Sequence, residues 1–472
     1  MSLIKYAKKN LYLHKNCESI TEYALSLAEN DNHDSDCIVL YHDLLRLKGM
    51  PEYYQNNRRL FWGTLEMIYG DYKDHSIARC VTVQMPSTFS SERQISVARN
   101  IAQKIRELDE VSVDLIVRSE HGLTTAYLLI PHASWSHGRW HILGKVARLY
   151  SMSLWPYICE VFAYNEALKD AKNASSIDVS QFPPIYILAS ISEASRLLKL
   201  KLDSGGNPNE KKREDKLMPL CHAVKYGCIE NVKILLEAGA DVFEADQYLH
   251  LVYIAIQNHD PVTLKRLLDK GLSPESYNER DLSPLAYAVV HDSIECLKVL
   301  LAAGADPNKR PEYPTWHTSQ GESSQLTPLY ASLGEGLENF EAFKILVDHG
   351  ADLFAEHEYR KTPMFKILKM DKNSPYLQYL LKDTEKFILA EPDKMYKGIV
   401  IEHVSGLRRF LIDTGDKYVI LFSENIVYTY TRQGKMFPCT SPTTGDIVSF
   451  KTTKAGWTEM NILSKRVSLW EE

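Results

Sequence analysis

The sequence predicts a multidomain α+β protein with three parts: an α+β domain over residues 1–178, an all-α helical solenoid over 179–384 and a small β-barrel over 385–472. A glycine-headed phrase recurs in the middle part, where Gly205, Gly239, Gly271 and Gly304 are 34, 32 and 33 residues apart. The first part shows no repeat, and after Asp383 the apolar residues change from helical spacing to alternation, which is typical of strands. A length of 472 residues is compatible with three domains.

The repeated phrase and its surroundings predict stacked helix pairs. Most copies precede a Pro-Leu pair such as Ser283-Pro-Leu285 or Thr327-Pro-Leu329, and each follows an apolar doublet such as Leu300-Leu301. Proline suits the first turn of a helix, and glycine suits the left-handed position just after one. This pattern resembles the ankyrin repeat, and we expect about five or six units between Pro183 and Asp383. Helical solenoids of this kind recognise other proteins by shape, so the resemblance implies protein binding. The copies are Gly205-Gly-Asn-Pro-Asn209, Gly239-Ala-Asp-Val-Phe243, Gly271-Leu-Ser-Pro-Glu275, Gly304-Ala-Asp-Pro-Asn308 and Gly350-Ala-Asp-Leu-Phe354.

One connection in the array is longer than the others. Gly304 and Gly350 are 46 residues apart, and the surplus lies at about 309–326. In ankyrin arrays this connection is a β-hairpin finger, and an exposed tryptophan is a common anchor at protein interfaces. The alternative is a surface insertion whose tryptophan folds back on its neighbours. The candidate protein-binding residues are Tyr313, Trp316, His317 and Gln320.

The first 178 residues predict helices followed by an antiparallel sheet. The segment Ser119-Glu-His-Gly122 separates two alternating runs and predicts a hairpin. The expected helices are Glu18–Glu29, Cys37–Lys48, Asn57–Tyr69 and Ser91–Leu108, and the expected strands are Ser76–Gln84, Val111–Arg118, Leu123–Ile130 and Tyr157–Tyr164.

Two cysteines of this domain are candidate nucleophiles. Cys17 begins the first helical pattern, where free N–H groups and the helix dipole favour a thiolate. Cysteine hydrolases pair such a thiolate with a histidine and then an Asn or Asp, and His141 and Asn165 fit that order. The alternative pair is His121 with Cys159. The other interpretation is that these cysteines and histidines are structural.

The last domain predicts five short strands, beginning near Lys397, Phe410, Tyr418, Gly445 and Met460. In order and wording they resemble a cold-shock or related OB-type barrel. That resemblance implies single-strand binding by aromatic residues of the second and third strands, with a basic edge. From Lys386 onward the chain has 12 Lys and Arg and 10 Asp and Glu, a net charge of only +2. Nucleic-acid binding needs a stronger positive charge, so this favours the alternative of a structural or protein-docking module. The candidate nucleic-acid-binding residues are Arg408, Phe410, Tyr418 and Phe422.

Composition and charge exclude several classes of binding partner and cofactor. A formal charge of −6 argues against a dedicated nucleic-acid or anionic-membrane binder, and we expect no membrane span. The N-terminus lacks the apolar core of a secretory signal. The eight cysteines are scattered without metal-binding spacing, so we expect a reducing compartment, no metal and no cofactor.

The combined architecture resembles the translocated ankyrin-repeat effectors of Legionella, which are substrates of type IV secretion. The resemblance rests on the three parts and on the insertion between Asn308 and Thr327. It implies secretion by a bacterium into a host cell, a site of action in the host cytoplasm or nucleus, a host-protein partner, and an N-terminal domain similar to cysteine proteases. It leaves the oligomeric state and the substrate of any hydrolase open.

Overall fold

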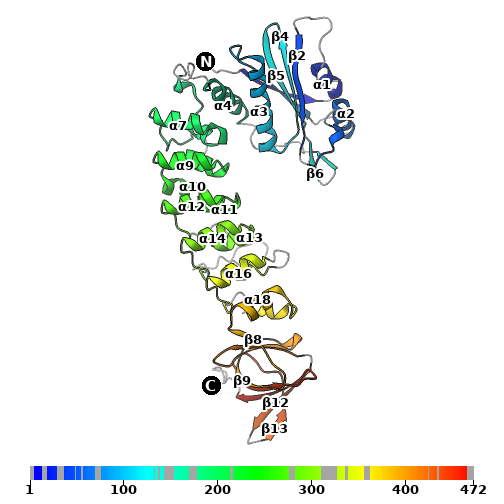
Figure 1. Ribbon diagram of the computed structural model, residues 1–472, viewed down its shortest axis with the longest axis vertical. Coiled ribbons are helices and arrows are strands. Elements are labelled where there is room, and N and C mark those ends of the chain that lie inside the picture. Colours follow the sequence, from blue (N-terminus) through cyan, green and yellow to red (C-terminus); the bar gives the residue numbers. More distant parts are fainter. Residues whose placement is uncertain are drawn as a thin grey trace. The chain divides into compact units, whose positions relative to one another are not determined.

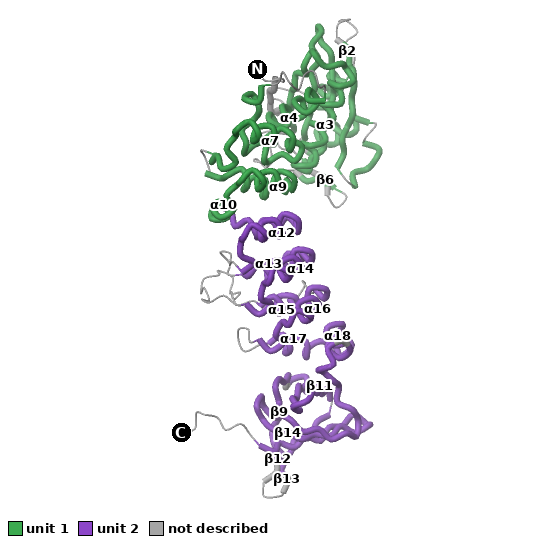
Figure 2. Tube along the Cα trace, turned by 60° about the vertical axis from the view of Figure 1, so that its left-hand side comes forward, with its two compact units in different colours: residues 1–248 green, residues 249–472 purple. Residues whose placement is uncertain are grey.

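The computed structural model describes residues 5–12, 19–28, 37–47, 49–54, 57–69, 76–131, 133–136, 139–142, 154–169, 178–212, 216–275, 282–309, 327–334, 339–355, 362–423, 425–432 and 435–464. They form two compact units, residues 1–248 and 249–472 (Figure 2). The division falls inside the helical array, so the predicted domain boundaries stay a prediction. In the described part of the chain, no helix is both long enough and apolar enough to cross a membrane.

The N-terminal domain is an antiparallel sheet between two layers of helices. The sheet order is β1-β3-β5-β4-β2, with helices α1 and α2 on one face and α3 on the other (Figure 1). A tight turn at His121 and Gly122, both with positive φ, joins β4 to β5 and confirms the predicted hairpin. The strands are β1 Lys5–Tyr12, β2 Cys37–Leu45, β3 Ser76–Gln84, β4 Val113–Glu120 and β5 Leu123–Pro131, and the helices are α1 Ile20–Ala28, α2 Arg58–Tyr69, α3 Ser91–Asp109 and α4 Trp155–Ala167. A small hairpin, β6 Ala133–Ser136 and β7 Arg139–Ile142, follows β5.

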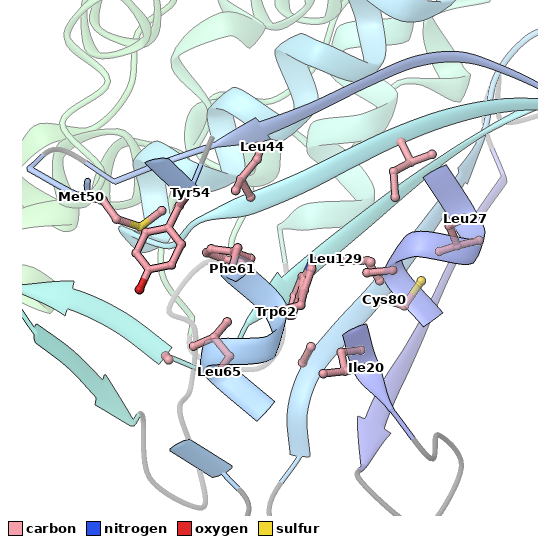
Figure 3. Close-up of a cluster of buried hydrophobic side chains, with 14 residues drawn as sticks. Ile20, Leu27, Leu44, Met50, Tyr54, Phe61, Trp62, Leu65, Cys80 and Leu129 are labelled. Carbon is pink, nitrogen blue, oxygen red and sulfur yellow. The ribbon is translucent and has the colours of Figure 1, made fainter. Parts of the chain in front are cut away.

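Strand alternation builds a core on each face of this sheet. Ile116 and Leu129 face α1 and α2, where they join Phe61, Trp62 and Leu65 in one buried cluster (Figure 3). The intervening strand residues face α3, which contacts β4, β2 and β5. The apolar stripe of α3, with buried Val97, Ala98, Ile101, Ala102 and Ile105, covers them.

Two predicted elements of this domain are wrong. The stretch Cys37–Leu45 is the edge strand β2, paired along its length with β4, rather than a helix. Its apolar residues fit both the helical spacing and the alternation of a strand, and pairing with β4 makes it a strand. Conversely, Tyr157–Tyr164 belongs to helix α4, whose second residue is a proline suited to a helical first turn. When nearly every residue of a short segment is apolar, the spacing of its apolar residues does not distinguish a strand from a helix.

The predicted repeats are confirmed as six helix pairs among the described residues. Each pair has a short first helix, and in the first five pairs the second helix ends before the glycine of the phrase. That glycine adopts a left-handed φ, 85° at Gly239 and 87° at Gly304, at which other residues are strained. The pairs are α6 Ile185–Ala189 with α7 Ser195–Asp203, α8 Pro219–Lys225 with α9 Ile229–Glu237, α11 Leu251–Gln257 with α12 Pro261–Asp269, α13 Pro284–Val290 with α14 Ile294–Ala302, α15 Pro328–Ala331 with α16 Phe340–Asp348, and α17 Pro363–Lys369 with α18 Pro375–Asp383.

The last residue of the phrase links consecutive repeats. The side chain of Asn308 donates to the Gly350 carbonyl at 3.0 Å and accepts from the Asp352 N–H at 2.7 Å. Asn209 makes the same two bonds, to Gly239 and Asp241. The repeated asparagine is therefore explained by pairing between the loops of neighbouring repeats. Phe243 stands at the corresponding position of the second copy, and there it is the second residue of helix α10 Val242–Leu249.

The C-terminal domain is an eight-stranded, barrel-like sheet. Its order is β13-β12-β15-β14-β9-β10-β11-β8, and it wraps around one cluster that includes Val400, Phe410, Leu421, Phe450 and Ile462. The five predicted strands are present as β9, β10, β11, β14 and β15; β8, β12 and β13 were not predicted. The strands are β8 Phe387–Leu389, β9 Met395–Val404, β10 Arg409–Asp413, β11 Tyr418–Phe422, β12 Asn425–Arg432, β13 Lys435–Pro438, β14 Ile447–Thr452 and β15 Trp457–Ser464.

Candidate protein-binding surface

The first helices of the repeats carry a distinctive set of side chains. None of the six described first helices contains an Asp or Glu, whereas each second helix contains at least one. In residues 249–472 the first helices instead bring aromatic rings together. Tyr253 and Tyr287 lie edge to face at 5.1 Å, and Tyr287 lies 4.1 Å from the ring of His291. In residues 249–472 the first helices therefore carry clustered aromatic side chains and no carboxylates, with Tyr253 buried and Tyr287 half-buried.

The predicted hairpin finger lies outside the described residues. This holds for all four of its candidate contact residues, Tyr313, Trp316, His317 and Gln320. The flanking elements are described: Asn308 closes one repeat, and Thr327 caps α15 by accepting from the Tyr330 N–H. The insertion thus follows the loop of Asn308 in the chain and precedes the first helix α15.

The structure does not bring the four candidate nucleic-acid residues onto one open face. Phe410 is fully buried in the sheet core, because it points inward together with Val419 and Leu421. A buried ring cannot stack on a base, so its assignment was wrong. Arg408 is exposed.

The outward face of β10 and β11 is covered by the last ankyrin repeat. Tyr418 lies 5.2 Å from the ring of Phe354, and Phe422 lies under the guanidinium of Arg409 at 5.0 Å. The same guanidinium donates to the carbonyls of Leu368 and Met370 at the end of α17. On the sheet side, Glu402 accepts from the Thr362 hydroxyl at 2.9 Å. This face of the C-terminal domain therefore docks onto the solenoid, as the alternative interpretation of the barrel expected.

The principal thiol site is only partly described. Cys17 lies outside the described residues. His141 is half-buried on β7, and Asn165 lies on helix α4, not after a strand. The Asn165 amide donates to the Glu193 carbonyl at 2.8 Å, which fixes it between α4 and the turn at Ser192–Ala194. The described contacts therefore give Asn165 a structural role.

The alternative pair of His121 and Cys159 is contradicted. Cys159 is fully buried inside α4, and burial raises the pKa of its thiol, with a smaller contribution from Glu160. A thiol held in its protonated form is a poor nucleophile. His121 is exposed in the β4–β5 turn, where its backbone has a φ of 49°.

Two features of the N-terminal domain had no signal in the sequence. Asp114, fully buried on β4, accepts from Arg58 and from the Trp62 indole N–H at 2.8 Å. A groove of about 1020 Å³ lies where the end of β2 meets α3, with Arg46, Arg99 and several carboxylates along it. Among the described residues no cluster of His, Cys, Asp and Glu is arranged to hold a metal ion. In the sequence, Asp114, Arg58 and the charged residues of the groove are isolated charges of the kind that usually face solvent. Only the folded structure brings them together.

Comparison with known proteins supports the assignment of the array. The family model of the ankyrin repeat matches residues 215–247 and 280–311. The chain is 27% identical over 237 residues to a putative ankyrin repeat protein of Fowlpox virus, covering 46% of this chain and 65% of that protein. It is 28% identical over 158 residues to the human transient receptor potential cation channel subfamily A member 1, and 32% identical over 101 residues to zebrafish (Danio rerio) inversin. These stretches cover 33% and 21% of this chain but only 14% and 9% of those two proteins.

The chain spans less than two thirds of each of these relatives, so the similarity concerns the repeats. With the six helix pairs, it places this protein among those that carry an ankyrin array. Such arrays are protein–protein interaction modules.

Proposed function

We propose that this protein is an effector that a bacterium delivers into a host cell, where its ankyrin array captures a host protein. The observation that carries the proposal is the array itself, whose described first helices contain no carboxylate and include the half-buried ring of Tyr287. Such a surface suits protein recognition, because rings contribute large contact areas at little conformational cost. The architecture that resembles Legionella effectors supports delivery, with the host cytoplasm or nucleus as the place of action.

The hairpin finger is proposed as the anchor of the captured protein. Deleting Tyr313–Ser323, or replacing Trp316 by Ala, should abolish partner capture and leave the melting temperature nearly unchanged, since a surface insertion contributes little to the stacked core. A matched control is Trp457→Ala, which removes another tryptophan, 52% exposed, from the C-terminal sheet. Affinity purification from host-cell lysate with the three variants provides the measurement. Capture that survives the deletion would remove the finger from the proposal.

Delivery is tested separately from capture. A reporter enzyme fused to the chain should enter host cells from a bacterium with an intact type IV secretion system and not from a strain that lacks it. Fractionation of the host cells then distinguishes cytoplasm from nucleus. Equal reporter signals from both strains would contradict type IV delivery and leave the binding function standing.

The proposed thiol-hydrolase activity now depends on Cys17 and His141. A thiol-reactive probe near neutral pH should then label the chain, and Cys17→Ala should remove most of that label. Cys439, a partly exposed cysteine, supplies the control variant Cys439→Ala. Labelling that follows Cys439 alone would end the hydrolase hypothesis.

A further inference from the structure

Positive groups sit on aromatic rings along the end of the array. The Lys366 ammonium lies 3.9 Å from the centre of the Tyr330 ring, and Lys369 lies 5.0 Å from that of Phe365. Arg409 of β10 continues the series, because it bonds the carbonyls on either side of Lys369 and covers Phe422. We call this surface the cation–aromatic strip, made of Tyr330, Phe365, Lys366, Lys369, Arg408 and Arg409.

The helices that carry the strip contain no carboxylates, and the segments beside them contain three. Helices α15 and α17 contain no Asp or Glu. Glu402 accepts from Thr362, Asp371 accepts from the Asn373 N–H at 2.8 Å, and Asp413 accepts from the Gly415 N–H at 2.8 Å. Each of these three carboxylates has a local hydrogen-bond partner and keeps its negative charge. The strip has four cations, Lys366, Lys369, Arg408 and Arg409, of which Lys369 and Arg408 are exposed to solvent.

We propose that the cation–aromatic strip binds an extended acidic segment of the protein that the ankyrin array captures. This inference rests on the proposed function and specifies the chemistry of the partner. Carboxylates suit the strip because Lys and Arg offer charge-assisted N–H donors to them. A single-stranded nucleic acid suits it less well, because Tyr330 is only 8% exposed and a cation already lies over one face of both Tyr330 and Phe365.

Peptide binding by the full-length chain tests the proposal. The probe is a fluorescein-labelled peptide of about twelve residues, roughly 40 Å when extended, in which Glu alternates with Ser. A second peptide replaces every Glu by Gln, and an oligothymidylate of similar length represents nucleic acid. We expect the Glu peptide to bind by fluorescence anisotropy at low salt, the Gln peptide not to bind, and binding to weaken as salt is added.

Charge reversal locates the site. The double variant Lys369→Glu/Arg408→Glu should weaken Glu-peptide binding at least about tenfold, because two attractions become repulsions. The control variant Lys298→Glu/Lys454→Glu changes the net charge equally at side chains that are 50% and 85% exposed elsewhere in residues 249–472, and we expect less than about a twofold change. Circular dichroism and thermal melting verify that both variants are folded.

Three outcomes would overturn the inference: equal binding of the Glu and Gln peptides, equal losses in the two double variants, or tighter binding of the oligothymidylate with loss in the strip variant. The last would identify the strip as a nucleic-acid site. Partner capture by the strip variant separates this inference from the proposed function. If the strip variant captures the array's partner at wild-type affinity, the acidic-segment inference fails and the protein-binding function stands. If the finger deletion and the wild type capture equally little, the proposed function itself fails.

Discussion

The buried Asp114 carboxylate allows the sharpest prediction about stability. Its side chain is 0% exposed and that of Arg58 is 12% exposed. The Arg58 Nε lies 2.9 and 2.8 Å from the two carboxylate oxygens, and one terminal guanidinium nitrogen lies 2.7 Å from Oδ1. Asp114→Ala removes every acceptor at once and leaves the guanidinium and the Trp62 N–H without this partner. Removing one partner of a buried ion pair costs about 3–5 kcal/mol, and we expect Asp114→Ala to lower the free energy of unfolding of the N-terminal domain by that amount.

Hydrogen exchange measured by mass spectrometry reports this loss where it occurs, because unfolding of a chain with several domains is not a single transition. Peptides from α2 and β4 should exchange faster by roughly two to four orders of magnitude, since each 1.4 kcal/mol is a factor of ten. Peptides from the C-terminal sheet, in the other compact unit, should exchange at their wild-type rate.

The neighbouring residue supplies a matched control. Arg59 pairs with Glu22 at 2.8 Å, but those side chains are 65% and 64% exposed. Glu22→Ala should therefore cost less than about 1 kcal/mol, although it also removes one carboxylate from an arginine of α2. The double variant Asp114→Leu/Arg58→Met should recover much of the loss, because it leaves no unpaired charge in the core. Equal protection in Asp114→Ala and Glu22→Ala would refute the argument from burial.

Three further predictions concern other parts of the chain. Gly398→Ala should unfold the C-terminal sheet locally, seen as lost exchange protection in β9 and β10, because a Cβ there would lie 2.2 Å from the Asp413 carbonyl oxygen; wild-type protection would contradict it. Asn308→Ala should lower array stability by about 1–2 kcal/mol in urea denaturation through loss of its two bonds to the next repeat, whereas an unchanged midpoint would show that those bonds are dispensable. Burial raises the pKa of Glu166, but hydrogen bonds from Lys169 and Arg93 outweigh it and lower the pKa below 4.5 overall. The stability that Glu166 contributes is therefore complete above pH 4.5 and is lost as pH falls through the folded-state pKa, so the difference between wild type and Glu166→Gln should shrink on acidification; a constant difference would refute it.

Local chemistry explains which elements the sequence could predict. The repeats follow from proline, glycine and apolar residues that act within one helix pair and recur. The turn at Ser119–Gly122 follows from residues that tolerate positive φ between two alternating runs. The helix at α3 follows from a long apolar stripe at helical spacing. In each case the physical cause lies within about twenty residues of chain.

The two misassigned segments lacked such a cause. Both Cys37–Leu45 and Tyr157–Tyr164 are apolar runs that fit more than one period. Pairing with β4 makes the first an edge strand, and burial beside α3 makes the second a helix. Their partners lie about seventy and fifty residues away, so no local pattern could choose between the alternatives.

The sequence by itself determined that the middle of this protein is a stack of ankyrin repeats and that its C-terminal part alternates as strands do. Tertiary structure decided which side chains are available for binding. Alternation predicts that Tyr418 and Phe422 share a face and that Phe410 and Leu421 point the other way, but not which face meets solvent. The last repeat covers the face that carries Tyr418 and Phe422, and the face that carries Phe410 and Leu421 forms the core of the sheet. Exposure depends on what packs against a face, and here the covering residues come from a different domain, so only the folded chain reveals it.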